Sequence, residues 1–362
     1  MNFNTSVILG KSKTGKTQNI LFNEVKQLIE DKNDLVILDY KREYYNHFYK
    51  KLKEDNYDIK VVNFNDPLKS DGWNPLSLIY TIYNYENNKD KAVELLQKMS
   101  KNIFYEENSK DDPFWCNMAS NLFIGLSLIL INISRKSKDH RTISFSSIMT
   151  LLNIGEQRDK DENITILKKY VESLNTQDPI YIALSSIVYA PTETKGSILS
   201  VFKVKMNNYL LRENLVNSFL FPSTSEGKLN QTNKNYAVFI IGNHSLDRLS
   251  NIFIEQIFTE AYDEKRKAAF ILDGYDNLPT LYSIEDMINK SNNSNIKLYL
   301  TSKKSLDDKT VKNIEGILLT KKTNYYEKDE EIELPTLMSP VEYKEDLKEV
   351  LIKELKKQTK NS

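Results

Sequence analysis

The residues with the clearest chemical meaning form a segment rich in glycine and lysine near the start of the chain. Its spacing, G-x-x-x-x-G-K-[ST], is that of a phosphate-binding P-loop, made here by Gly10, Lys11, Ser12, Lys13, Thr14, Gly15, Lys16 and Thr17. The two glycines let the backbone curl so that successive N–H groups point at phosphate oxygens. Lys16 is expected to reach the β- and γ-phosphates, and Thr17 to place its hydroxyl on Mg²⁺. The segment therefore predicts binding of ATP with Mg²⁺.

A P-loop needs a strand before it and a helix after it, and the flanking sequence has both patterns. A short apolar run at 6–9 predicts a buried strand at 5–9, and helical spacing of apolar residues predicts a helix to about residue 31. Further apolar runs predict strands at 35–39, 59–64, 236–241, 268–273, 296–300 and 314–319, with a helix at 249–264. Short buried strands that alternate with helices indicate a mostly parallel sheet covered on both faces, so the predicted fold class is α/β.

The stretch after the third predicted strand has a different character. From residue 77 to 215 apolar residues recur at helical spacing and strand signals are sparse, which predicts an inserted all-helical domain. The nucleotide-binding domain is then expected in two parts, 1–76 with the P-loop and 216–325 with a second nucleotide motif. Residues 326–362 are expected to form a C-terminal helix, from 340 to 357, and a basic tail.

A P-loop ATPase also needs a carboxylate at the end of a neighbouring buried strand to hold Mg²⁺, the Walker B residue. Asp39 and Asp273 both end predicted strands, and Asp273 is favoured because its strand lies beyond the insertion. Many such ATPases place a glutamate next to activate water, but here the next residue is Gly274, which cannot act as a base. Asp276 is the candidate replacement. Binding is therefore expected, and hydrolysis is a separate question. Gly274→Glu is expected to raise turnover if the surrounding geometry is otherwise intact.

Composition restricts the remaining possibilities. The 50 basic and 50 acidic residues balance, so any contact with DNA has to come from a local patch. The candidate patches are Lys50 with Lys51 and Lys53, Lys303 with Lys304, and Lys321 with Lys322.

The single cysteine, Cys116, excludes an internal disulfide, as is typical of a reducing cytoplasm. The most apolar stretch, 122–133, is shorter than a bilayer-spanning helix, so we expect a buried helix there and a cytoplasmic chain without a transmembrane segment of its own.

Five segments together resemble the TraG/TraD-type coupling proteins of conjugation and type IV secretion. They are the P-loop at 10–17, Leu38-Asp39-Tyr40-Lys41-Arg42-Glu43, Trp73-Asn74-Pro75-Leu76, Asp112-Pro113-Phe114-Trp115 with 119–122, and the Walker B segment 271–278. The chain departs from the family pattern at several places. Its first strand begins almost at residue 1, where the family has a membrane-spanning segment. Gly274 replaces the usual glutamate. The family usually has a glutamine that senses the γ-phosphate after the next strand, and this chain has Thr301 and Ser302 near that place. The segment 289–293 lacks the arginine that the family usually has there.

The resemblance implies a RecA-like P-loop fold and a hexameric, homo-oligomeric ring that binds ATP and Mg²⁺. It also implies DNA as a partner, with single-stranded DNA or a relaxase–DNA complex as options, together with the membrane components of a type IV secretion system. The expected location is the cytoplasm, with recruitment to the inner face of the membrane as an option. Two alternatives stay open: a non-hydrolysing ATP-binding scaffold or partner subunit, and a cytosolic DNA-pumping ATPase unrelated to conjugation.

Overall fold

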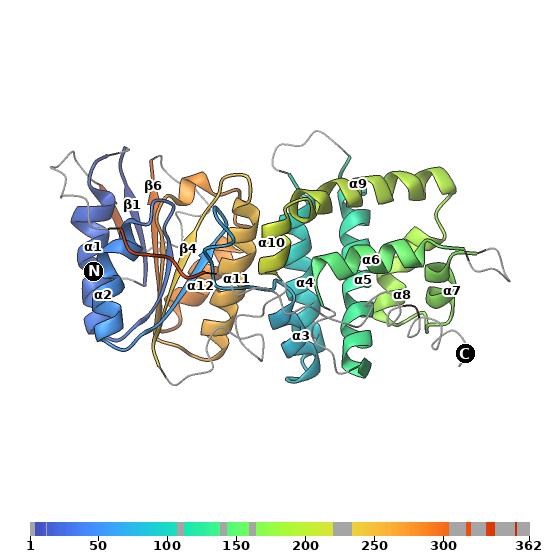
Figure 1. Ribbon diagram of the computed structural model, residues 1–362, viewed down its shortest axis with the longest axis horizontal. Coiled ribbons are helices and arrows are strands. Elements are labelled where there is room, and N and C mark those ends of the chain that lie inside the picture. The colour runs from blue at the N-terminus through green and yellow to red at the C-terminus, as the bar shows by residue number, and fades with distance from the viewer. Residues whose placement is uncertain are drawn as a thin grey trace. The chain divides into compact units, whose positions relative to one another are not determined.

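The computed structural model describes residues 4–11, 13–106, 112–137, 143–158, 164–219, 234–303, 316–319, 331–336 and 352. The chain falls into two compact units, residues 1–72 with 228–337 and residues 73–227 with 338–362. The first holds the sheet and the second holds the helices α3 to α10 (Figure 1). Apart from 331–336 and 352, the predicted C-terminal helix and tail lie outside the described residues.

The described part of the sheet has seven strands, and every paired neighbour is parallel. The strands are β1 (Thr5–Leu9), β2 (Asp34–Leu38), β3 (Asp58–Asn63), β4 (Tyr236–Ile241), β5 (Ala268–Leu272), β6 (Ile296–Ser302) and β7 (Gly316–Leu319). Their order is β3-β4-β2-β5-β6-β1-β7, so β6 lies between the P-loop strand β1 and β5. The predicted parallel α/β fold is therefore confirmed. Strands buried on both faces read as continuous apolar runs, which is why the sequence predicted them.

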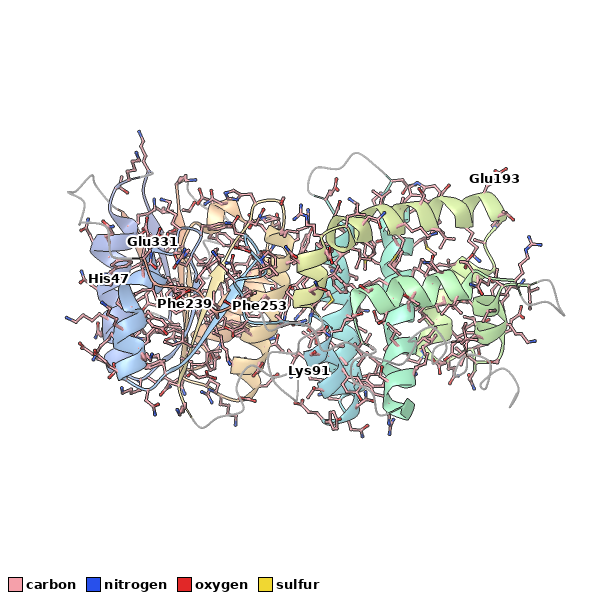
Figure 2. The ribbon with its side chains drawn as sticks, viewed as in Figure 1. His47, Lys91, Glu193, Phe239, Phe253 and Glu331 are labelled. Carbon is pink, nitrogen blue, oxygen red and sulfur yellow. The ribbon has the colours of Figure 1, made fainter. Side chains whose placement is uncertain are left out.

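Helices cover both faces of this sheet (Figure 1). The helices α1 (Phe22–Glu30) and α2 (Glu43–Glu54) lie on one face, and α11 (Asp247–Asp263) and α12 (Ile284–Asn292) on the other. Figure 2 labels Phe239 on β4 and Phe253 on α11, both fully buried. The Phe239 ring packs edge-on against Tyr45 of α2, with centroids 5.2 Å apart. Side chains alternate across each strand, so each helix pair buries its own set of strand residues.

The helical unit is built around α5 (Pro113–Ser137), which packs against α4, α8 and α9. The eight helices described here are α3 (Ser77–Asn84), α4 (Lys89–Phe104), α5, α6 (Phe145–Gly155), α7 (Ile166–Glu172), α8 (Pro179–Val188), α9 (Thr192–Leu210) and α10 (Glu213–Ser218). Stacked and edge-on contacts link Phe123 of α5 to Phe104 and Phe145, and Phe104 to Phe202. The helix α10 belongs to this unit, so the helices extend past residue 215, where the helical domain was predicted to end.

Helix α5 is longer than the apolar stretch that predicted it. Among the described residues it is the one helix long and apolar enough to cross a membrane, judged by length and composition over 113–135. Within the structure, however, 72% of that window is buried, as in the core helix of a globular unit. The sequence underestimated its length because the helix begins with half-exposed residues around Trp115 that carry no continuous apolar signal.

The turn Trp73-Asn74-Pro75-Leu76 connects the start of the helical unit to two of its later segments. The backbone N–H of Trp73 donates to the carbonyl of Ser218 at 3.0 Å, and the Trp73 ring packs edge-on against Phe219. The side-chain amide of Asn74 donates to the carbonyl of Ile143 at 2.6 Å. Both side chains are buried, so this motif stabilises the packing of the helical unit.

Candidate nucleotide-binding site

The P-loop begins where β1 ends, at the carboxyl edge of the sheet. The N–H of Gly10 donates to the carbonyl of Ser302 at the end of β6, at 3.0 Å, which fixes the start of the loop to the neighbouring strand. Gly15 has φ 81° and ψ 16°, a left-handed conformation that glycine adopts without steric cost. A short π-helix, Lys16–Leu21, follows and leads directly into α1. Ser12 lies outside the described residues.

The Lys16 side chain folds back over its own loop. Its ammonium donates to the carbonyls of Gly10 and Lys11, the latter at 3.0 Å. Burial lowers the pKa of Lys16, whereas the carboxylates of Asp273 and Asp276 raise it. An ammonium that is partly removed from water and held over a ring of backbone groups is placed to meet a phosphate.

Asp273 follows β5 and brings together the two groups expected to hold Mg²⁺. The Thr17 hydroxyl donates to Asp273 Oδ2 at 2.6 Å, although 256 positions separate the two residues. The Tyr44 hydroxyl donates to the same oxygen at 2.9 Å, and the Thr301 hydroxyl donates to Asp273 Oδ1 at 2.7 Å. Burial raises the pKa of Tyr44 well above its usual value, so this phenol stays protonated and remains a donor. A hydroxyl beside a carboxylate is a donor set that suits Mg²⁺.

Asp39, the other strand-end carboxylate, has different surroundings. It follows β2, is 2% exposed, and its Oδ2 accepts a hydrogen bond from the backbone N–H of Tyr45 at 2.9 Å. Burial raises the pKa of Asp39 to about 7, and the charge of Asp273 contributes in the same direction. Asp39 therefore holds the first turn of α2, while Asp273 is the carboxylate that meets Thr17.

Gly274 has a backbone conformation that disfavours a side chain. Its φ is 83°, and its N–H donates to the Thr301 hydroxyl at 2.7 Å. A Cβ at this position would lie 2.7 Å from Nδ2 of Asn277. A side chain is strained in this left-handed conformation whatever space surrounds it. The structure therefore argues against the expectation that Gly274→Glu raises turnover, because glutamate cannot adopt this backbone without cost.

Asp276 lies in the short turn Tyr275–Asn277 that follows Gly274. Its Oδ2 accepts a hydrogen bond from the backbone N–H of Lys303 at 3.3 Å and lies 3.8 Å from the Lys303 ammonium. The carboxylate faces the same cavity as Lys16, so the turn does not direct it elsewhere. In this arrangement Asp276 is an ion-pair partner, and it could act as a base only after Lys303 moves away.

One cavity of 340 Å³ joins these groups. The charged residues in its lining are Lys13, Lys16, Lys41, Lys303, Asp39, Glu43, Asp273 and Asp276. Among the described residues there is no cluster of three or more His, Cys, Asp or Glu that could hold a metal ion. A metal here would thus depend on Thr17, Asp273 and the phosphates of a ligand, which is how Mg²⁺ commonly binds beside nucleotides.

Sequence reasoning missed Tyr44 and assigned Lys303 to a candidate patch for contact with DNA. Tyr44 lies in the first turn of α2, where an aromatic residue is ordinarily expected to pack in the hydrophobic core. No local pattern could show that its hydroxyl reaches a carboxylate on another strand. Of the other lysines predicted to contact DNA, Lys304, Lys321 and Lys322 lie outside the described residues. Lys51 pairs with Asp55 at 3.0 Å, and Lys53 lies over the Tyr49 ring.

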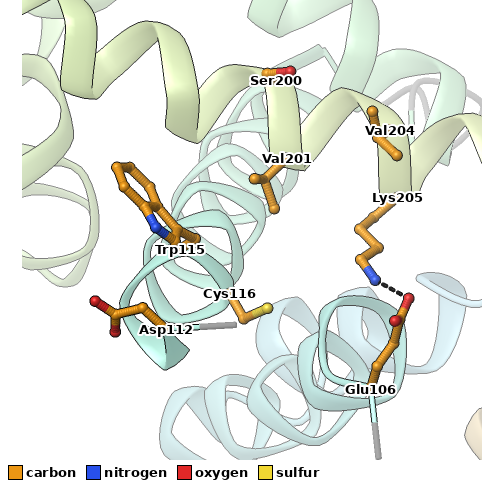
Figure 3. Close-up of a pocket in the computed structure, with 8 residues that line it drawn as sticks. All are labelled: Glu106, Asp112, Trp115, Cys116, Ser200, Val201, Val204 and Lys205. Atoms are coloured by element: carbon orange, nitrogen blue, oxygen red, sulfur yellow. Dashed lines mark hydrogen bonds and ion pairs between the residues drawn. The ribbon is translucent and has the colours of Figure 1, made fainter. Parts of the chain in front are cut away.

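The helical unit has a cavity of its own, of 300 Å³, shown in Figure 3. Its walls come from the start of α5, with Trp115 and Cys116, and from α9, with Val201 and Val204. Lys205 and Glu106 form an ion pair at its rim. Asp112, the first residue of the Asp112-Pro113-Phe114-Trp115 motif, accepts a hydrogen bond from the N–H of Phe114 at 2.9 Å and so starts α5. The motif thus shapes this cavity but adds no cluster of catalytic groups.

The parallel sheet, the P-loop between β1 and its helix, and the strand-end carboxylate on β5 define a P-loop α/β fold of the nucleotide-binding kind. Residues 2–305 match the family model for "Type IV secretory system Conjugative DNA transfer". The match covers well over half of the chain, and the chain belongs to this family of conjugative coupling proteins. The family that the sequence motifs suggested is therefore confirmed. No curated protein matches the chain.

Solved structures show the same fold at low sequence identity. The unbound monoclinic form of the bacterial conjugative coupling protein TrwBdeltaN70 is 13% identical, with a TM-score of 0.56, over 82% of this chain and 61% of that one. The plasmid coupling protein TrwB in complex with ADP and Mg²⁺ is also 13% identical, with a TM-score of 0.54, over 87% of this chain and 63% of that one. The chain thus spans less than two thirds of the length of these proteins.

Proposed function

We propose that this chain is an ATP-binding coupling protein that recruits or moves a DNA–relaxase substrate to a type IV secretion channel. Family membership supports the role in conjugative DNA transfer, and one contact is the main support for the nucleotide-binding site. The hydroxyl of Thr17 and the carboxylate of Asp273 meet at 2.6 Å beside the P-loop ammonium. These three groups are the ones that a P-loop ATPase uses on Mg²⁺ and on the β- and γ-phosphates. The TrwB complex with ADP and Mg²⁺ supports the same ligands for this fold.

Each residue has a defined task in this proposal. The backbone N–H groups of 10–17 and the following helix bind phosphate oxygens, and Lys16 exchanges its carbonyl partners for phosphate. Thr17 and Asp273 would hold Mg²⁺, whose charge would neutralise that of the phosphates. Tyr44 and Thr301 hold the Asp273 carboxylate in place from two sides.

Nucleotide binding is tested by removing the P-loop ammonium. We expect Lys16→Ala to weaken Mg·ATP binding by about 10-fold or more, because a charge-assisted hydrogen bond to phosphate is lost. Isothermal titration or a fluorescent nucleotide measures the dissociation constant. Lys26→Ala, on the exposed side of α1, is the matched control and should leave it unchanged. An unchanged affinity in Lys16→Ala would contradict the site.

A second function, a non-hydrolysing ATP-binding scaffold or partner subunit, is supported by the backbone at Gly274 and by the pairing of Asp276 with Lys303. A general base contributes about 10²–10⁴-fold in rate, so its absence predicts tight binding with slow turnover. Single-turnover hydrolysis with and without DNA distinguishes the two functions. Turnover at the rate of an ordinary motor would exclude the scaffold.

The partners and location are also part of the proposal. We place the chain in the cytoplasm, in a homo-oligomeric ring at the inner face of the membrane beside type IV secretion components. Because the charge is balanced, a contact with DNA has to come from a local basic patch and be electrostatic. Binding of single-stranded or duplex DNA should then weaken steeply as salt rises, since each phosphate contact releases counterions. An affinity independent of salt would count against DNA as a direct partner.

A further inference from the structure

Glu43 is the first residue of helix α2 and lines the same 340 Å³ cavity as Lys16 and Asp273. Two hydrogen bonds fix the turn that joins β2 to this helix. The N–H of Arg42 donates to the carbonyl of Asp39 at 3.2 Å, and the Asp39 carboxylate accepts a bond from the first turn of α2. The turn therefore starts α2 at the carboxyl edge of the sheet, the edge where the P-loop also begins.

Four carboxylates of the described residues line this cavity, and three of them have fixed surroundings. Asp273 accepts hydrogen bonds from three hydroxyls, and Asp276 pairs with the Lys303 ammonium. Burial raises the pKa of Asp39 to about 7, and its carboxylate holds the first turn of α2. Glu43 is the carboxylate in this lining that remains for the transfer of a proton.

The Glu43 carboxylate is held loosely but lies close to the expected metal position. It is 3.8 Å from the ammonium of Lys41, and the side chains of Lys41 and Glu43 are 79% and 37% exposed. An exposed pair of this kind contributes little stability, so Glu43 can leave it. Burial is the main cause of the raised pKa of Asp39 and of Tyr44, and the charge of Glu43 contributes to both. The Tyr44 hydroxyl in turn donates to Asp273.

The connection after β2 also lies where a side chain at position 274 would point. β2 and β5 are adjacent parallel strands, with Leu38 in register with Leu272. A Cβ added at Gly274 would lie 4.0 Å from Cδ2 of the Tyr40 ring. Tyr40 and Glu43 belong to one connection and both line the cavity, so the segment after β2 can supply the carboxylate that position 274 lacks.

We propose that Glu43 is the general base of ATP hydrolysis in this chain, in place of the glutamate that is missing at Gly274. The inference rests on the proposed function and adds a catalytic residue to its nucleotide site. The Glu43 carboxylate takes one proton from a water molecule while the oxygen of that water forms a bond to the γ-phosphorus of ATP. The bond from the γ-phosphorus to the oxygen that bridges to the β-phosphate breaks, and its electron pair leaves with ADP. The partly exposed Glu43 then releases the proton to solvent, which regenerates the carboxylate.

The test separates the chemical step from nucleotide binding and uses the full chain. Single-turnover hydrolysis of Mg·ATP, with and without single-stranded DNA, gives the rate, and a fluorescent β,γ-imido analogue of ATP gives the affinity. Glu43→Gln should lower the rate by about 10²–10⁴-fold and change the affinity by less than about threefold, because the amide keeps the shape but cannot take the proton. Glu54→Gln, an exposed glutamate at the other end of the same helix, removes the same charge and should change neither.

The outcomes distinguish this inference from the nucleotide site itself. If the unaltered chain binds no nucleotide, the proposed function and this inference both fail. If it binds the analogue but completes no turnover of ATP, the nucleotide site stands and the role of Glu43 is overturned. An unchanged rate in Glu43→Gln, or a loss of affinity as large as the loss of rate, would also overturn that role. If Asp276→Asn abolishes turnover while Glu43→Gln retains it, the base is Asp276 and not Glu43.

Discussion

The strands β2 and β5 are both followed directly by an aspartate, and the two carboxylates have different hydrogen-bond partners. The two strands are parallel neighbours, with Leu38 in register with Leu272, so that Asp39 and Asp273 occupy equivalent positions on adjacent strands. Asp273 accepts hydrogen bonds from the side-chain hydroxyls of Thr17, Tyr44 and Thr301. Asp39 instead accepts one from the backbone of α2 and is almost fully buried, although it also lines the cavity.

The difference shows that the donors, and not the strand-end position, decide what such a carboxylate does. Hydroxyl groups can rotate and can themselves coordinate a metal, so Asp273 is held in place yet remains available to a cation. A backbone N–H is fixed, and burial favours the protonated form of Asp39. We therefore assign Asp273 to the proposed nucleotide site and Asp39 to the support of α2.

The largest expected effect concerns Asp39 and pH. A pKa of about 7 in the folded protein against 3.8 in an unfolded chain means that the folded state retains a proton that the unfolded state loses. The free energy of unfolding should therefore fall as pH rises from about 4 to 7, by roughly 4 kcal/mol from this group. Asp39→Asn should remove that dependence. Denaturant titrations across this range measure it, and parallel curves for the two proteins would show that Asp39 is not buried in this way.

The next effect concerns Asp273. Asp273→Asn keeps the shape but removes the negative charge, so the Mg²⁺-dependent part of ATP affinity should fall by about 10- to 100-fold. Affinities measured with Mg²⁺ and with EDTA isolate that part. Asp39→Asn serves as the matched control on the adjacent strand and should retain the response to Mg²⁺. The same loss in both variants would contradict the distinction drawn between the two carboxylates.

A smaller effect is expected from the backbone next to Asp273. Gly274→Ala should cost about 1–2 kcal/mol of stability, because a Cβ is strained in the left-handed conformation. Gly196, in helix α9 with no neighbouring atom within 4 Å of an added Cβ, is the matched control. Gly196→Ala should stabilise the protein by up to about 1 kcal/mol. Thermal unfolding of both variants tests the pair, and a stabilising Gly274→Ala would show that the conformation at this turn is different.

The smallest effect is expected from Tyr44. Tyr44→Phe removes one of the hydroxyls that orient Asp273 and should cost about 1 kcal/mol, seen as a modest loss in Mg²⁺-dependent nucleotide affinity. Tyr45→Phe removes a hydroxyl that donates to the carbonyl of Glu333, at 3.0 Å, and should leave that affinity unchanged. Equal effects of the two substitutions would mean that Tyr44 supports α2 and not the carboxylate.

The local patterns predicted the elements well and the contacts poorly. The predicted strand 5–9 coincides with β1, and the predicted strand 236–241 coincides with β4, because buried parallel strands carry continuous apolar runs, 7–9 in β1 and the whole of β4. The length of α5 and the end of the helical unit were less accurate, since half-exposed helix ends lack such a signal. The pairing of Thr17 with Asp273 was expected only from the needs of the chemistry.

The sequence by itself determined the P-loop motif, the parallel α/β class and the helical segment between β3 and β4, because each depends on residues close together in the chain. Only the tertiary structure decided that Asp273 and not Asp39 meets Thr17, and that Gly274 is left-handed. It also decided that Lys303 lines the same cavity as Lys16. These contacts depend on the strand order, which places β6 between β1 and β5. Residues such as Thr17 and Asp273, 256 positions apart, become neighbours only when the sheet forms, and no local periodicity records that order.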